Sequence, residues 1–152
     1  MTLNGGTFDT GGLSEHGLAG TTVTPGMGAV TLSSNSIIDF GGGASVIAFA
    51  DSSTQTWTGT LSIYNWSGAV GGNGTDQLYF GTDATGLTAT QLGQIAFYSD
   101  SGTTFLGTAG YANDLDGELA PVPEPSTWFA AALAFGGLGF TQLRRMRKGG
   151  QP

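Results

Sequence analysis

The sequence contains few side chains that carry out acid–base or nucleophilic chemistry. It has one histidine, His16, and no cysteine among 152 residues. Cysteine nucleophiles, thiolate zinc sites and disulfides are therefore excluded. An α/β-hydrolase would need a G-x-S-x-G elbow, and none occurs. We expect His16 to lie in a surface loop, and we expect a protein that is not an enzyme and needs no cofactor.

Two stretches partly match calcium-binding loops. Gly71–Tyr79 fits the calcium-binding nonapeptide G-G-x-G-x-D-x-U-x at every defined position, with Asp76 as its carboxylate. That repeat binds calcium only when copies stack, and no second copy occurs. Asn113–Glu118 matches part of an EF-hand loop but lacks both terminal carboxylates. We expect a glycine turn before a strand in the first case and an acidic, solvated linker in the second. No metal site is expected, and Asp76 is the one residue retained as a weak metal candidate.

Three aromatic side chains, Trp57, Tyr64 and Trp66, could stack on sugar rings if they shared one exposed face. The alternative is that they belong to the core, since the chain has few other large apolar side chains. The second interpretation is favoured. A carbohydrate-binding module nevertheless remains open as an alternative function.

The charges are divided between the two ends of the chain. All eleven acidic residues lie between Asp9 and Glu124, and all four basic residues lie at 144–148. The pI of about 4.1 argues against a nucleic-acid partner, which would require clustered Lys and Arg. Between the two charged parts, residues 126–143 carry no formal charge.

Residues 126–143 are predicted to form a single transmembrane helix. At about 1.5 Å per residue the segment reaches roughly 27 Å, just enough to cross the hydrocarbon core of a bilayer. The basic residues that follow favour a cytoplasmic C-terminus and a body outside the cytoplasm. A buried helix in a soluble core is the alternative, and it is disfavoured because the segment is apolar around its whole circumference. The basic anchor consists of Arg144, Arg145, Arg147 and Lys148.

The order of these elements resembles a known sorting signal. Val122-Pro123-Glu124-Pro125-Ser126, an apolar stretch and a basic end are similar to the PEP-CTERM motif of exopolysaccharide-producing Gram-negative bacteria. The resemblance implies that the protein is a substrate of exosortase, a membrane cysteine protease-transpeptidase. It also implies a transient inner-membrane anchor and delivery to the cell surface. Pro123, Glu124 and Pro125 would form the recognition element.

The N-terminus departs from that family. Met1–Gly6 has neither the basic nor the apolar region of a secretory signal peptide. We expect the chain to be the C-terminal part of a longer protein. The predicted organisation is a β domain at 1–118, a linker with the sorting motif at 119–125, the helix at 126–143 and a basic cytoplasmic tail at 144–152.

The body, residues 1–118, is predicted to be all-β. Short runs rich in Val, Ile, Thr, Phe and Tyr are separated by glycine, and no run has a helical period. In Thr60–Tyr64 the alternation predicts Leu61 and Ile63 facing inward. Thr88–Gln91 is a capping box that predicts one helical turn. The predicted strands are 28–32, 36–40, 45–50, 58–66, 77–80, 94–98 and 103–106.

Abundant Gly, Ser and Thr with few charges favour a β-solenoid, that is, the end of a parallel β-helix, over a β-sandwich. Asn4–Gly12 resembles the glycine-rich repeats of autotransporter passenger domains. Phe40-Gly41 and Phe80-Gly81 are forty residues apart, but no strict period emerges. We expect a structural or adhesive surface protein with exopolysaccharide as a partner. A polysaccharide-active enzyme, which would need paired carboxylates in a cleft, is the least favoured class.

Overall fold

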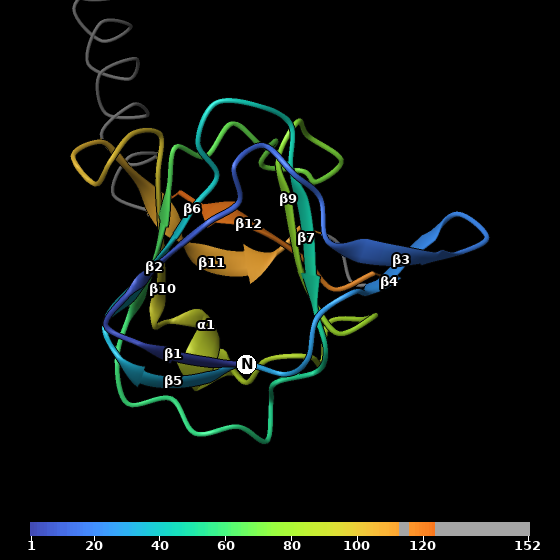
Figure 1. Cartoon of the computed structure of the whole chain (residues 1–152), viewed down its shortest axis with the longest axis horizontal. Helices are drawn as coiled ribbons and strands as arrows, with labels where there is room; N and C mark the ends of the chain where they lie inside the picture. Colours follow the sequence, from blue (N-terminus) through green and yellow to red (C-terminus); the bar gives the residue numbers. More distant parts are fainter. Residues whose placement is uncertain (113–115, 124–152) are drawn as a thin grey trace, which may run out of the picture. The chain divides into compact units, whose positions relative to one another are not determined.

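Short strands account for most of the body. The computed structural model describes residues 1–112 and 116–123. Apart from one helical turn, the regular elements in these residues are strands (Figure 1). The strands are β1 (Thr2–Asn4), β2 (Thr7–Asp9), β3 (His16–Ala19), β4 (Thr22–Pro25), β5 (Thr31–Ser34), β6 (Ser36–Asp39), β7 (Val46–Phe49), β8 (Leu61–Tyr64), β9 (Gln77–Phe80), β10 (Ile95–Tyr98), β11 (Phe105–Tyr111) and β12 (Glu118–Val122), and the helix is α1 (Ala89–Leu92).

The strands stack in parallel on three faces, so that each pass of the chain forms one rung. On the first face β1 pairs with β5, and Leu32 bridges to Trp57. On the second face β2, β6, β8 and β10 pair in that order. On the third face β7 pairs with β9, and Glu15 bridges to Ile47. This stacking confirms the predicted all-β, solenoid-like fold.

The rungs differ in length. On the second face Phe8 pairs with Ile38 and Ile38 with Ile63, which are separations of 30 and 25 residues. Ile63 then pairs with Phe97, a separation of 34 residues. Stacking fixes the strands but leaves the corners free to vary, because loops on the outside of a solenoid tolerate insertion. This variation explains why no strict period is visible in the sequence.

Antiparallel strands close the C-terminal end of the solenoid. The eight-stranded sheet has the order β2-β6-β8-β10-β11-β12-β9-β7. β11 and β12 therefore connect the second face to the third, with antiparallel pairing to β10 and β9. Residues 119–122 were expected in a linker but belong to β12, and the compact unit extends to Val122. The boundary of the body is thus Val122 and not residue 118.

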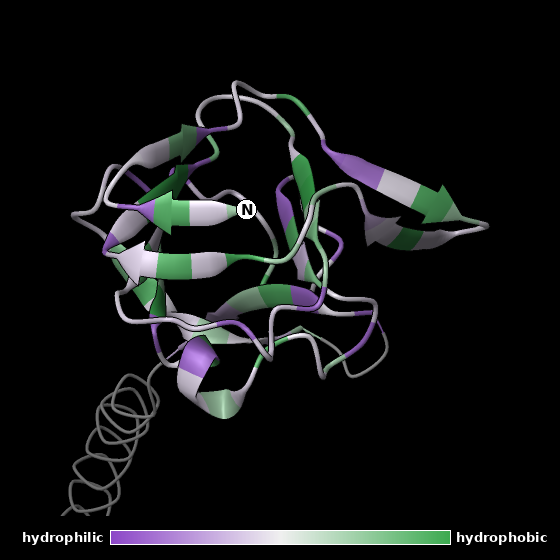
Figure 2. Ribbon diagram, turned by 60° about the horizontal axis from the view of Figure 1, so that its bottom comes forward, coloured by the Kyte–Doolittle hydropathy of each residue, from purple (hydrophilic) through white to green (hydrophobic). Residues whose placement is uncertain are grey.

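The core lies between the three faces. Leu61 and Ile63 of β8 are fully buried while Ser62 and Tyr64 are partly exposed, which confirms the predicted alternation. Figure 2 shows apolar and polar residues alternating along the strands. The large side chains with almost no exposure are Leu32, Ile38, Phe40, Ile47, Phe49, Leu61, Ile63, Leu78, Phe80, Ile95, Phe97 and Leu119.

The helical turn α1 confirms the predicted capping box. The Thr88 hydroxyl accepts a hydrogen bond from the Gln91 amide, and the Gln91 side chain accepts one from the Thr88 amide. The Gln91 side-chain amide also donates to the carbonyls of Ser52 and Gln55 on the preceding rung. On the first face, α1 therefore takes the place of a strand in the fourth rung and packs on the rung that contains Trp57.

Strands β3 and β4 form a hairpin that projects from the solenoid (Figure 1). His16 is the first residue of β3, and it pairs with Pro25. Its Nδ1 lies 3.1 Å from the carbonyl oxygen of Gly17. The histidine is half-buried in a strand, so the expected surface-loop position is wrong. No acid or serine side chain is hydrogen-bonded to it among the described residues.

Candidate functional site

The first residues of the sorting motif are part of the folded body. Val122 ends β12, opposite Thr108 of β11. A Cβ at Gly107 would overlap the Val122 backbone, and one at Gly110 would overlap its side chain. Two glycines thus allow β12 to lie close against β11 up to its last residue. Pro123 follows directly, half-buried and outside the strand.

The rest of the predicted sorting machinery lies outside the described residues. This applies to Glu124, Pro125 and Ser126, to the predicted helix at 126–143 and to the basic anchor at 144–148. In the part of the chain that the structure describes, no helix is long and apolar enough to cross a membrane.

Glu118 holds the other end of β12. Its side chain is fully buried, and its two carboxylate oxygens lie 2.9 and 3.0 Å from the Asn73 amide nitrogen, which donates to them. The Tyr79 hydroxyl donates to the same carboxylate over 3.4 Å. Burial raises the pKa of Glu118 above its usual range, because a charge without solvent is disfavoured. The expectation of a solvated linker is wrong at this residue.

The pKa of Tyr79 is raised for related reasons. The main cause is burial of the phenol, followed by the negative charges of Glu118 and Asp116. Tyr79 therefore stays protonated and remains a hydrogen-bond donor at neutral pH. Its one hydroxyl hydrogen has two acceptors within reach, the Gln77 side-chain oxygen at 2.8 Å and the Glu118 carboxylate at 3.4 Å. Together, Asn73, Tyr79 and Glu118 connect the glycine-rich loop, β9 and β12.

Asp76 is buried and its carboxylate serves the fold. One oxygen accepts hydrogen bonds from the Ser67 amide and hydroxyl at 2.8 and 2.7 Å. The other accepts from the Ser45 amide at 3.3 Å. β9 begins at the next residue, Gln77, so residues 71–76 form the expected turn before a strand. Within residues 1–112 and 116–123, no group of three or more His, Asp or Glu is placed to hold a metal ion.

The three aromatic residues considered for sugar stacking do not share an exposed face. Trp66 is only 4% exposed and packs edge-to-face against Phe40 and Phe97. Its indole Nε1 has no hydrogen-bond partner within the described part of the chain. Trp57 is half-buried, and its Nε1 donates to the Val30 carbonyl at 2.8 Å. Of the three, only Tyr64 lies on the outer side of a solenoid face.

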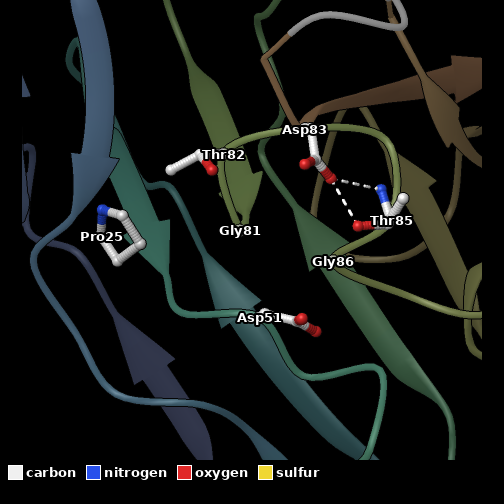
Figure 3. Close-up of a pocket in the computed structure, with 7 residues that line it drawn as sticks. All are labelled: Pro25, Asp51, Gly81, Thr82, Asp83, Thr85 and Gly86. Atoms are coloured by element: carbon white, nitrogen blue, oxygen red, sulfur yellow. Dashed lines mark hydrogen bonds between the residues drawn. The ribbon is translucent and has the colours of Figure 1, made fainter.

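A pocket of about 240 Å³ lies beside the end of β9 (Figure 3). Asp51 and Asp83 are its two carboxylates. The Asp83 carboxylate accepts from the Thr85 amide and hydroxyl, and these bonds lower the pKa of Asp83. Asp51 accepts in the same way from Ser53. The residues that line the pocket are Pro25, Asp51, Gly81, Thr82, Asp83, Thr85 and Gly86.

This pocket was not among the sites predicted from the sequence, although one signal of it is visible there. Asp51-Ser52-Ser53 and Asp83-Ala84-Thr85 both have the pattern Asp-x-Ser/Thr, which is typical of a turn in which the carboxylate accepts from the residue two positions later. Both carboxylates therefore organise their own loops. A lowered pKa keeps Asp83 ionised at neutral pH, which is unsuited to a general acid.

The comparisons with known proteins concern the C-terminal end. A family model described as the PEP-CTERM protein-sorting motif matches residues 121–148. No curated protein matches the chain significantly, and no solved structure does so. The match begins at Pro121, inside β12, and continues through the proposed recognition element to Lys148. The motif implies secretion and processing by an enzyme of the exosortase type. The chain therefore carries a PEP-CTERM protein-sorting motif at residues 121–148, and an all-β solenoid-like body precedes this motif in the sequence.

Proposed function

We propose that this protein is a structural or adhesive component of the bacterial surface, and a substrate of exosortase with no catalytic activity of its own. The observation that carries the proposal is the sorting motif at 121–148, which begins with the last two residues of the final strand of a folded domain. In this proposal the apolar segment at 126–143 anchors the precursor in the inner membrane of a Gram-negative cell. Arg144 to Lys148 remain in the cytoplasm.

The composition of the body supports a passive role outside the cell. Ten of the eleven acidic residues precede Pro123, and no Lys or Arg lies before residue 144. Such a uniformly acidic surface resists association with anionic polymers. A solenoid with short strands and polar corners is a suitable scaffold for exposed loops. Delivery to the outer surface or the exopolysaccharide layer is the destination that the proposal assigns.

The cleavage region begins where the fold ends. Since Val122 is held in the sheet and Glu124 is two residues further on, almost no spacer separates the folded body from the recognition element. Processing near Pro123–Pro125 would release the body with β12 complete. The sorted product would therefore keep the whole fold.

The experiment follows the precursor in an exosortase-positive strain and its exosortase deletion mutant. The reading frame carries an N-terminal tag, and a cleavable secretory signal is supplied in front of it. We expect a product lighter by the mass of the C-terminal tail, and lost from the membrane fraction, only where exosortase is present. A variant with Pro123, Glu124 and Pro125 replaced by alanine should stay at precursor mass. Identical mass and membrane retention in the two strains would refute the proposal.

The control is Arg147→Lys, which preserves charge in the basic end. This variant should be processed like the wild-type protein. If the alanine variant and Arg147→Lys were processed equally well, the recognition element would lie elsewhere in the tail.

A further inference from the structure

A row of side chains crosses the outer side of the second face from β2 to β11. Asp9 lies opposite Asp39, and Asp39 lies opposite Tyr64. The Tyr64 and Tyr98 rings follow with centroids 5.5 Å apart. Tyr98 lies opposite Phe105, and their centroids are 5.6 Å apart. We refer to Tyr64, Tyr98 and Phe105 as the aromatic row.

The aromatic row faces away from the core. Tyr64 follows the fully buried Ile63, and Tyr98 follows the fully buried Phe97. Phe105 is 43% exposed, which is high for a phenylalanine in a strand. Tyr64 and Tyr98 are partly exposed, so the three neighbouring rings together present more apolar surface than Phe105 alone would.

The neighbouring row on the same face consists of small side chains. Ser62, Ala96 and Thr108 pair across β8, β10 and β11, two or three positions from the rings along each strand. Side chains two positions apart in a strand lie on the same side of the sheet. Because these neighbours are small, no large side chain of that row covers the rings.

Polar groups lie at the ends of the aromatic row. Asp39 accepts a hydrogen bond from the Asn65 side chain at 2.7 Å, beside Tyr64. Asp100 follows Tyr98 by two residues and accepts from the amides of Thr103 and Thr104. The carboxylates of Asp39 and Asp100 can accept hydrogen bonds from hydroxyl groups, and the Asn65 side-chain amide can donate hydrogen bonds to them. They also repel anionic ligands, and no Lys or Arg before residue 144 offsets them.

We propose that the aromatic row binds a neutral polysaccharide. Sugar rings present apolar C–H faces that pack on aromatic rings, and hydroxyl edges that reach the flanking carboxylates and amide. Adjacent rings of the row are inclined by 89° and 60°, so they do not form one flat platform. That arrangement suits a single chain in solution, whose successive sugar rings are turned relative to one another. The inference deepens the adhesive role proposed above and rests on it for its biological setting.

The test is a titration of the purified full-length chain, in detergent micelles, with a soluble mixed-linkage β-glucan. Tyr98→Ala and Phe105→Ala are each expected to weaken binding about three- to tenfold, the size of an aromatic contact. Leu18→Ala is the matched control, since Leu18 is 64% exposed on the projecting hairpin. It removes exposed apolar area far from the row and should leave affinity unchanged. Thermal unfolding of each variant shows that the fold is retained.

Several outcomes would overturn the inference. The first is that the wild-type chain does not bind the glucan. The second is that Tyr98→Ala and Phe105→Ala bind it as tightly as the wild-type chain does. The third is that Leu18→Ala loses as much affinity as the two aromatic variants. Binding of the polyanion alginate as tightly as the neutral glucan would also contradict it. If Phe105→Ala destabilised the fold, Phe105→Leu would retain the apolar volume but remove the ring, and it should still weaken binding. Normal exosortase processing together with absent glucan binding would refute the aromatic row alone, so the two proposals fail separately.

Discussion

At the scale of single residues, Gly107 determines how closely β11 and β12 approach. Its φ of 151° lies in the region that favours glycine, and an added Cβ would overlap the carbonyl group of Val122. Gly107→Ala should therefore push the end of β12 away from the sheet. We expect a loss of about 2 kcal/mol in the free energy of unfolding, seen as a fall of several degrees in Tm by circular dichroism.

Gly6→Ala provides the matched control for that substitution. No atom lies within 4 Å of a Cβ built at Gly6, and its φ is not positive. The control variant should unfold within about 0.5 kcal/mol of the wild-type chain. Equal Tm values for Gly107→Ala and Gly6→Ala would show that β12 is not tightly held at Val122.

Glu118 gives the protein a characteristic dependence on pH. Since burial raises the pKa of Glu118 in the folded state, the folded chain binds more protons than the unfolded chain between the two pKa values. Its contribution to stability is therefore present below the unfolded value, near 4.5, and declines as the pH rises through the folded value. Glu118→Gln removes this titration and keeps an oxygen that can accept from Asn73. We expect the variant to gain stability relative to the wild-type chain as the pH rises from 4.5.

Urea unfolding of both chains at pH 4.5 and pH 7.5 measures this difference. The comparison cancels the opposite contributions of Asp83 and Asp100, whose pKa values are lowered by hydrogen bonds from neighbouring threonines. A stability difference between the two chains that does not change with pH would contradict a raised pKa for Glu118.

At the scale of single elements, α1 depends on its N-cap. Thr88→Ala removes the hydroxyl that accepts from the Gln91 amide, and an N-cap of this kind contributes about 1 kcal/mol. The variant also loses the hydrogen bond from the Thr88 hydroxyl to the side chain of Gln91, the residue that connects α1 to the preceding rung. Thermal unfolding should show a lower Tm for Thr88→Ala. Thr90→Ala, at an exposed position within the same turn, should leave Tm unchanged or slightly higher.

The elements that could be predicted from sequence are those whose signal is local. The run Gln77–Phe80 and the capping box at Thr88 are each contained in a few residues, and both form as expected. β12 contains Glu118 and Pro121, which are unfavourable in a central strand. Pro121 lies beyond the part of β12 that pairs with β9. The Glu118 carboxylate accepts a hydrogen bond from the backbone amide of Asn73, which lies in a loop 45 residues away in the sequence. Neither circumstance is visible without the fold.

The register of the solenoid was equally hidden. Phe40-Gly41 and Phe80-Gly81 look like a repeat, yet Phe40 follows β6 on the second face and Phe80 ends β9 on the third. The aromatic row requires two rungs 34 residues apart to align and an antiparallel strand to pair with the second, so Tyr98 and Phe105 could not be grouped with Tyr64 from spacing. The sorting motif, by contrast, is linear, and a linear motif is legible in the sequence alone.

At the scale of the whole molecule, the fold and the sorting signal meet in one strand. β12 completes the sheet between β11 and β9, and its last two residues are the first two of the motif. A processing enzyme that acts after Val122 encounters a body that is already complete. One that acted before Glu118 would remove a strand from the middle of the eight-stranded sheet.

This difference predicts where the chain can be shortened. A chain that ends at Pro123 should retain the β-sheet spectrum and cooperative unfolding of the full-length body, because every strand is present. A chain that ends at Gly117 loses Glu118 to Val122, including the fully buried Leu119, and leaves β9 and β11 without the strand between them. We expect that chain to be degraded by low concentrations of the protease thermolysin. We also expect it to unfold without a cooperative transition. Thermolysin resistance and circular dichroism measure both properties, and a cooperative, resistant chain ending at Gly117 would place the end of the folded body before β12.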